Sequence, residues 1–122
     1  MKKIFFFFLI SIFLLSCQKQ KQISIIGGWR EVSAYAERNG QYSWGSAARF
    51  PLKLSFTEDG KYNAFYDVSA GHGSYSYDTS NMELKIQTIN PISNEVYTIS
   101  YLSDNYLIID YSTTYKIKFV RL

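Results

Sequence analysis

The 122-residue sequence contains only one cysteine, one histidine and two prolines. A single cysteine excludes an intramolecular disulfide. The lone histidine, His72, has no partner at a spacing typical of a metal site or of a catalytic base, so we interpret it as part of a flexible glycine-rich turn. The sequence also lacks a nucleophile elbow and a phosphate-binding loop. We therefore expect no enzyme, no metal site and no cofactor.

Strong charge of either sign is lacking as well. The formal net charge is +3, but two of the 13 basic residues and none of the ten acidic residues lie in the first 16 positions. Removal of these positions lowers the charge to +1, so most of the apparent basicity belongs to the start of the chain. Because nucleic-acid binding needs a basic patch, we expect no nucleic-acid partner.

A long apolar run occurs at the start of the chain, directly after Met-Lys-Lys. Residues 4–15 are almost wholly apolar, and a short apolar run behind two lysines is typical of a secretory signal peptide. The run is shorter than the roughly 20 residues that a membrane-spanning helix needs. The polar residues 18–22 then end it.

The residues Leu14-Leu15-Ser16-Cys17 resemble the lipobox of bacterial lipoproteins, Leu-x-small-Cys. The resemblance implies that residues 1–16 are a cleaved signal peptide and that Cys17 becomes the acylated N-terminus. Two or three acyl chains, typified by palmitate, anchor a protein stably to a membrane. Residues 17–26 would then form the acylated cysteine and a polar tether. A secretory signal with an incidental cysteine and an uncleaved anchor are the alternatives.

From residue 27 onward, apolar and polar residues alternate with a period of two. This alternation is typical of strands with one buried face, and the Asp59-Gly60 pair between two such runs predicts a hairpin. We expect one domain over residues 27–122, with a single long loop at 38–51. The expected strands are 29–36, 52–56, 62–68, 73–77, 82–88, 95–102, 106–111 and 115–121.

Short strands in this order predict an all-β, antiparallel, up-and-down barrel. Tight turns join neighbours in sequence, and closure of eight such strands removes the exposed edges of the sheet. A β-sandwich is the alternative, although it usually needs longer crossing connections.

Three motifs resemble the small lipocalin-like domains of bacterial lipoproteins. The first strand opens with Gly27-Gly28-Trp29, residues 54–62 read LSFTEDGKY, and residues 102–107 read LSDNYL. The resemblance covers about residues 26–122 and implies a calycin-like small β-barrel.

The same resemblance implies that an arginine near the end of the last strand packs across the tryptophan of the first strand. Arg121 fits by position, and it alternates in phase with Tyr115, Ile117 and Phe119, so we expect it to point inward. An inward arginine needs an aromatic face or acceptors. We therefore expect Trp29 and Arg121 to close one end of the barrel.

Tyrosine is abundant, with 11 residues, and its ring and hydroxyl suit an amphipathic ligand. An eight-stranded barrel of this size holds one small ligand or fills with side chains. We expect the long loop to supply a lid and inward strand positions to line the pocket. The candidate ligand-binding residues are Tyr42, Trp44, Tyr62, Tyr66, Leu84, Ile86, Tyr111 and Tyr115. Glu31 faces inward with Trp29, unless a bulge turns it to the surface.

Two functions follow from these expectations. The first is a lipid-anchored envelope lipoprotein that binds a small apolar or amphipathic ligand. The alternative is a non-enzymatic accessory protein with a filled barrel, whose outer tyrosines (Tyr97, Tyr101 and Tyr106) contact another envelope protein or a glycan. Gln18 stands where an aspartate would retain an enteric lipoprotein in the inner membrane. We therefore expect the outer membrane, on its periplasmic side because no acidic run follows Cys17.

Overall fold

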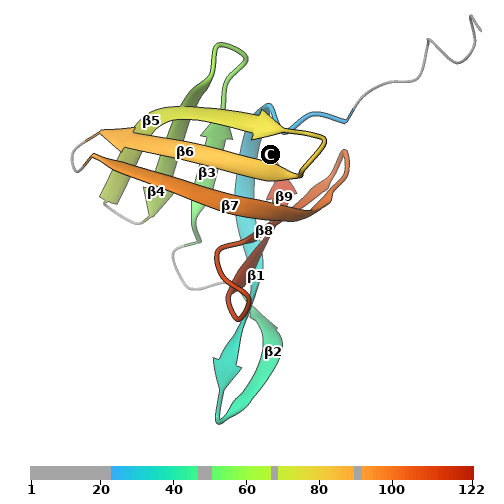
Figure 1. Cartoon of the computed structure of the whole chain (residues 1–122). Helices are drawn as coiled ribbons and strands as arrows, with labels where there is room; N and C mark the ends of the chain where they lie inside the picture. Colours follow the sequence, from blue (N-terminus) through green and yellow to red (C-terminus); the bar gives the residue numbers. More distant parts are fainter. Residues whose placement is uncertain (1–22, 47–50, 67–68, 90–91) are drawn as a thin grey trace, which may run out of the picture.

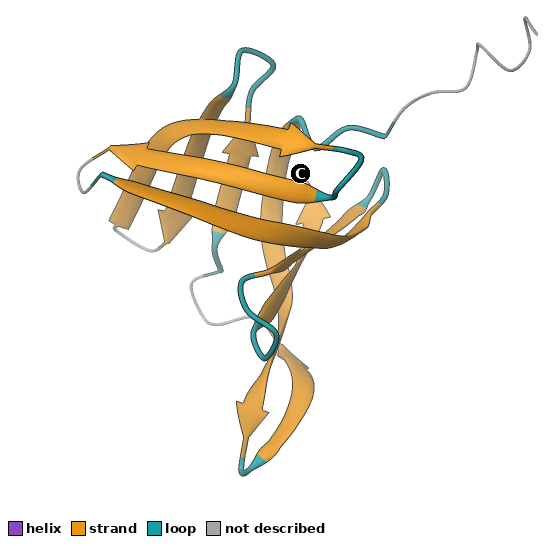
Figure 2. Ribbon diagram, in the orientation of Figure 1, coloured by secondary structure: helices purple, strands orange, loops and turns teal. Residues whose placement is uncertain are grey.

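The computed structural model describes residues 23–46, 51–66, 69–89 and 92–122. Cys17 and the expected signal peptide lie outside these residues. The described chain holds strands and loops but no helix (Figure 2), and so no helix within it could cross a membrane. The strands are β1 (Gly27–Arg38), β2 (Gln41–Ser46), β3 (Lys53–Phe56), β4 (Lys61–Tyr66), β5 (Ser69–Asp78), β6 (Glu83–Ile89), β7 (Ser93–Leu102), β8 (Tyr106–Asp110) and β9 (Lys116–Arg121).

Eight of these strands form a closed antiparallel barrel (Figure 1). From β3 to β9 each strand pairs with the next one in sequence, β1 pairs with β3, and a further pairing between β1 and β9 closes the ring. The predicted eight-stranded, up-and-down barrel is confirmed. The closing β1–β9 pairing rules out the sandwich alternative, because a sandwich leaves its two sheets unjoined at the edges.

The expected long loop at residues 38–51 is wrong for Gln41–Ser46, which forms strand β2. On one edge of β1, the segment Gly27–Arg30 pairs with β3 and the segment Ser33–Arg38 pairs with β2. The β1–β2 hairpin therefore projects from one end of the barrel (Figure 1).

The turn of this hairpin explains why the loop expectation failed. Asn39 and Gly40 both have positive φ, 54° and 79°, as in the two-residue type I′ turns that join antiparallel strands. Asn-Gly is the strongest short-range hairpin motif, and alternation of Tyr42 and Trp44 follows it. Both features are visible in the sequence.

The glycine-rich segment around His72 is also a strand rather than the expected flexible turn. His72 lies inside β5 and pairs with Asn63 on β4 and Ile89 on β6. Its side chain is exposed on the outer face. Strand β5 thus begins four residues before the expected position, because glycine permits extended backbone where sequence propensity disfavours it.

The interior of the barrel forms one continuous core. Residues 23–26, which the sequence assigned to the tether, contribute Ile25 to it, so the packed structure begins before Gly27. The buried apolar residues are Ile25, Trp29, Ala34, Leu54, Phe56, Tyr62, Leu84, Ile86, Ile99, Leu107, Ile109, Ile117 and Phe119.

Candidate ligand-binding site

The two ends of the barrel differ in what fills them. We call the end at which β1 begins and the β3–β4 turn lies the Trp29 end. The opposite end, from which the β1–β2 hairpin projects, is the hairpin end (Figure 1).

Trp29 and Arg121 plug the Trp29 end, as the sequence predicts. Trp29 has no exposed surface, and its indole Nε1–H donates a hydrogen bond of 2.9 Å to the carbonyl of Ile25. The guanidinium carbon of Arg121 lies 4.2 Å from the centroid of the Trp29 ring. This is a cation–π contact.

The guanidinium of Arg121 also fastens the chain that enters the barrel. Arg121 donates hydrogen bonds of 2.7 Å to the carbonyls of Ile26 and Ser24, and one of 2.6 Å to the carbonyl of Asp104. These acceptors satisfy a cation that would otherwise be costly beside an apolar core. Packing and hydrogen bonds close this end around Trp29, and an open pocket of about 260 Å³ remains between residues 23–26 and the end of β5.

Glu31 is the first polar side chain inside the barrel on the way from Trp29 to the hairpin end. The side chain is 7% exposed, and its Oε1 accepts a hydrogen bond of 3.0 Å from the N–H of Leu52. The register of β1 against β9 shifts between Glu31 and Ser33, and the next buried residue is Ala34. The bulge therefore comes after Glu31 and leaves it facing inward, which decides between the two interpretations.

Tyrosines from β7 and from the β8–β9 connection surround this region. The rings of Tyr97 and Tyr111 meet edge to face with centroids 4.7 Å apart. The rings of Tyr111 and Tyr115 lie 6.1 Å apart and tilted. The hydroxyl of Tyr97 donates a hydrogen bond to the carboxylate of Glu95.

Tyr62 on β4 belongs to the same cluster, although β4 is not a neighbour of β7 or β8. Burial, and then the charge of Glu95, raise the pKa of Tyr62 to about 12. Burial first, and then nearby tyrosines and glutamates, raise the pKa of Tyr111 far above its ordinary value. The ring of Tyr62 itself packs 5.5 Å from the ring of Phe56, and the exposed Glu95 acts on its hydroxyl from the other side of the barrel.

Part of the wall formed by β4 and β5 carries small or no side chains, beside the inward Tyr62 and Tyr75. In the ring of eight strands, β4 and β5 lie across from β8 and β9. Ala64, Gly71 and Gly73 share the inward phase of Tyr75 along these strands. A Cβ built on Gly71 would meet no atom within 4 Å, whereas one built on Gly73 would lie 1.9 Å from the carbonyl oxygen of Gln87. Gly71 therefore borders open space, and Gly73 permits a close backbone approach.

The proposed pocket residues fall into three groups. Tyr62, Tyr111 and Tyr115 belong to the cluster at the hairpin end. Tyr66 is half exposed at the end of β4. It lies close enough to Tyr115 to raise the pKa of Tyr115, after the larger effects of burial and Glu31. Leu84 and Ile86 are buried in the apolar core.

Tyr42 and Trp44 do not line the interior. Trp44 pairs with Tyr35 across the hairpin, and the ring of Tyr35 lies 5.6 Å from Trp44 and 6.0 Å from Tyr42. Tyr35 follows the inward-facing Ala34, so these three rings share the opposite, outer face. The expected lid is thus a strand hairpin whose aromatic face continues the outside of the barrel.

Tyr97 was expected on the outer surface, and this expectation is wrong. It lies in phase with Ile99, which is fully buried, and packs against the core. Tyr101 follows a register shift between Ile99 and Tyr101 on β7 and is exposed, as is Tyr106.

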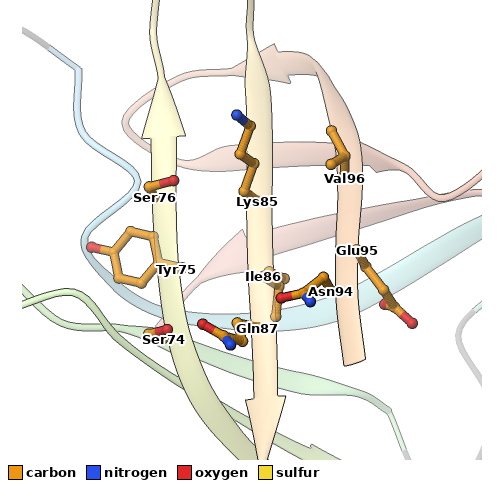
Figure 3. Close-up of a pocket in the computed structure, with 9 residues that line it drawn as sticks. All are labelled: Ser74, Tyr75, Ser76, Lys85, Ile86, Gln87, Asn94, Glu95 and Val96. Carbon is orange, nitrogen blue, oxygen red and sulfur yellow. The ribbon is translucent and has the colours of Figure 1, made fainter. Parts of the chain in front are cut away.

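An open groove of about 280 Å³ crosses the outer face of β5, β6 and β7 (Figure 3). Its lining includes exposed side chains such as Ser74, Lys85 and Asn94. These alternate with buried residues on the same strands, so the groove lies outside the barrel. Among the described residues, no three histidine, cysteine or acidic side chains come together as metal ligands would.

No family model and no curated protein matches this chain. Solved structures do match it. A lipocalin-like protein from Bacteroides uniformis ATCC 8492 superposes with a TM-score of 0.61 at 15% identity, over 80% of this chain and 98% of that one. The fold is lipocalin-like. An uncharacterized protein from Bacteroides eggerthii DSM 20697 gives the same TM-score at 11% identity, over 81% of this chain and all of that one. At these identities the likeness concerns the fold alone.

The sequence reasoning missed several residues at the hairpin end of this lipocalin-like barrel. Tyr97 could have been placed inside from its phase with the apolar Ile99, and Glu95 could have been placed on the same face of β7, at its exposed start. The glycines could not, because the roles of Gly71 and Gly73 depend on what lies opposite them in the folded barrel.

Proposed function

We propose that this protein is a lipid-anchored envelope lipoprotein whose barrel binds a small amphipathic molecule at its hairpin end. The observation that carries the proposal is the interior of that end. Tyrosines and glutamates from β1, β4, β7 and the β8–β9 connection converge there, opposite the open space at Gly71. Binding sites in such barrels combine apolar walls with a few convergent polar groups.

Native mass spectrometry tests ligand binding directly. We expect residues 18–122, purified from cells as a soluble protein, to carry a small mass that leaves on denaturation. Gly71→Leu provides the matched control, because it extends a side chain into open space without a backbone clash, and it should lose this mass while its unfolding temperature stays unchanged. A clean apo mass in the parent protein would instead favour the alternative, an accessory protein that acts through its surface.

The exposed aromatic face of Tyr35, Tyr42 and Trp44 supports that alternative. Such a face on a projecting hairpin suits contact with an envelope protein or a glycan. Retention of a partner on the parent protein, and its loss on Trp44→Ala, would establish this second function.

The lipid anchor is the second part of the proposal, with the outer membrane and its periplasmic face as the location. We expect radiolabelled palmitate to enter the full-length protein and to be absent from Cys17→Ala. Label that persists in this variant would contradict the anchor.

An anchor at Cys17 would also determine which end of the barrel lies near the membrane. Residue 23 lies at the Trp29 end and is six positions from Cys17, a stretch that spans about 20 Å at most. In this arrangement the Trp29 end faces the membrane, and the hairpin end opens toward the aqueous compartment.

A further inference from the structure

We infer that the ligand carries a positively charged headgroup, such as an alkylammonium, which the tyrosines and glutamates of the hairpin end hold. This inference rests on the proposed binding function and names its ligand class. Four features of the site carry it.

The first feature is the density of aromatic rings. Tyr97, Tyr111 and Tyr115 contact one another in series, and Tyr62 faces them from the opposite wall. The faces of aromatic rings attract cations, and cages of several rings bind alkylammonium groups. The faces of these rings attract a cation and repel an anion, so the ring faces favour such a headgroup.

The second feature is the sign of the charged groups. Glu31 is inward and almost wholly buried, and Glu95 acts electrostatically on both Tyr62 and Tyr111. The ion pairs recorded between described residues join Lys61 to Asp59 and Lys116 to Asp110, so neither glutamate takes part in them. An anionic headgroup would meet the buried carboxylate of Glu31 and, at the rim, the exposed carboxylate of Glu95, which is unfavourable.

The third feature is that the cations close to Tyr115, Arg38 and Lys116, are engaged elsewhere, Lys116 with Asp110. Arg38 is near enough to lower the pKa of Tyr115, against the dominant effect of burial. However, its guanidinium donates hydrogen bonds to the carbonyls of Ser43, at 2.5 Å, and Ala34, at 3.1 Å, and it lies over Gly45. Arg38 therefore stabilises the hairpin and is not directed at a glutamate.

The fourth feature is room. Ala64 and Gly71 present little or no side chain to the space in front of the tyrosines, and a Cβ on Gly71 would still touch nothing. A headgroup next to Gly71 displaces no side chain at that position. Its apolar tail would run toward the buried Ile86 and Leu84 below.

Three small amphiphiles with the same six-carbon chain test the inference: hexyltrimethylammonium, hexanoate and 1-hexanol. The full chain, as processed by the cell, is held in nanodiscs of zwitterionic phosphatidylcholine, and binding is measured by isothermal titration calorimetry against empty nanodiscs. We expect hexyltrimethylammonium to bind at least about tenfold more tightly than 1-hexanol, and hexanoate to bind most weakly.

Charge-removing variants locate the effect. Glu95→Gln should weaken hexyltrimethylammonium binding about fivefold or more and leave 1-hexanol binding unchanged. Glu31→Gln keeps an acceptor for the Leu52 N–H and should act in the same direction. Glu58→Gln, in the exposed β3–β4 turn, is the matched control without effect.

Each remaining outcome overturns the inference in a recognisable way. If hexanoate or 1-hexanol binds as tightly as the cation and Gly71→Leu abolishes that binding, the barrel is a binding protein but not for cations. If none of the three probes binds, the inference fails together with the proposed function. If the cation binds but Gly71→Leu leaves it unaffected, the site lies elsewhere.

Discussion

The two ends of the barrel are built from the same strands, but their polar groups are arranged differently. At the Trp29 end, the polar groups are arranged in pairs: the indole N–H meets the Ile25 carbonyl, and Arg121 meets three carbonyls. At the hairpin end, glutamates lie beside tyrosines, and neither Glu31 nor Glu95 takes part in an ion pair between described residues. Completed polar pairs stabilise a fold, whereas carboxylates without a basic partner suit a cationic ligand. The difference supports the proposal that one end stabilises the barrel and the other binds the ligand.

Replacement of the two tryptophans tests this division most strongly. Trp29→Ala should lower the free energy of unfolding by about 3–5 kcal/mol, because it removes a fully buried ring and leaves Arg121 without its aromatic partner. Trp44→Ala, on the exposed face of the hairpin, should cost about 1 kcal/mol or less. Thermal unfolding followed by circular dichroism measures both. Equal losses would mean that the hairpin, and not only the Trp29 end, holds the barrel together.

Alkaline pH separates the two ends in another way. The pKa of Tyr62 is about 12 in the folded protein and about 10 in the unfolded chain. As pH rises, the unfolded chain therefore loses its proton first. Stability from this group is intact below pH 10 and falls between pH 10 and 12, by about 3 kcal/mol in total.

Urea unfolding at pH 9, 10 and 11 measures this decline. Tyr62→Phe should make the decline shallower, because phenylalanine has no proton to lose, and the part that remains comes from tyrosines such as Tyr111 whose pKa is also raised. Tyr101→Phe, on the outer face of β7, should leave the slope of the parent protein. A Tyr62→Phe protein with the parental slope would place the alkaline sensitivity outside the interior cluster.

The two inward glycines of β5, Gly71 and Gly73, allow tightly packed and open parts of the interior to be compared within one strand. Gly73→Ala should destabilise by about 1–3 kcal/mol, because its Cβ would lie 1.9 Å from the Gln87 carbonyl oxygen and force the backbone apart. Gly71→Ala should change stability by less than about 0.5 kcal/mol. Chemical unfolding of both variants gives the difference. Similar losses would indicate that the space at Gly71 is already filled.

How much of this was predictable depends on the range of the interactions concerned. Alternation and turn residues are local, and they predicted the barrel and most strand positions. The signal for the β1–β2 hairpin was also local, because Asn39-Gly40 is a typical hairpin turn. The expectation of a long loop did not use this signal. The Trp29–Arg121 contact joins the two ends of the domain in sequence, and the resemblance to lipocalin-like domains predicted it.

The candidate site was less accessible from the sequence because it forms across the barrel. Tyr62 lies near Glu95 only because β4 faces β7 and β8 after closure. The side to which Glu31 points depends on whether the β1 bulge falls before or after it. A shift of the bulge by one residue would turn Glu31 from the interior to the surface. Periodicity locates strands well, but it does not fix bulges or opposing walls.

The smallest expected effect concerns the aromatic face of the hairpin. Because Tyr42 and Trp44 lie on the outer face with Tyr35, we expect the double variant Tyr42→Ala, Trp44→Ala to change the affinity for a saturably bound apolar fluorescent probe by less than about threefold. Gly71→Leu should abolish that binding in the same assay. Loss of binding in the double variant would support the hypothesis that Tyr42 and Trp44 form a lid. The hairpin would then have to fold over the end of the barrel. Retention would confine ligand recognition to the interior and leave the hairpin free for a partner.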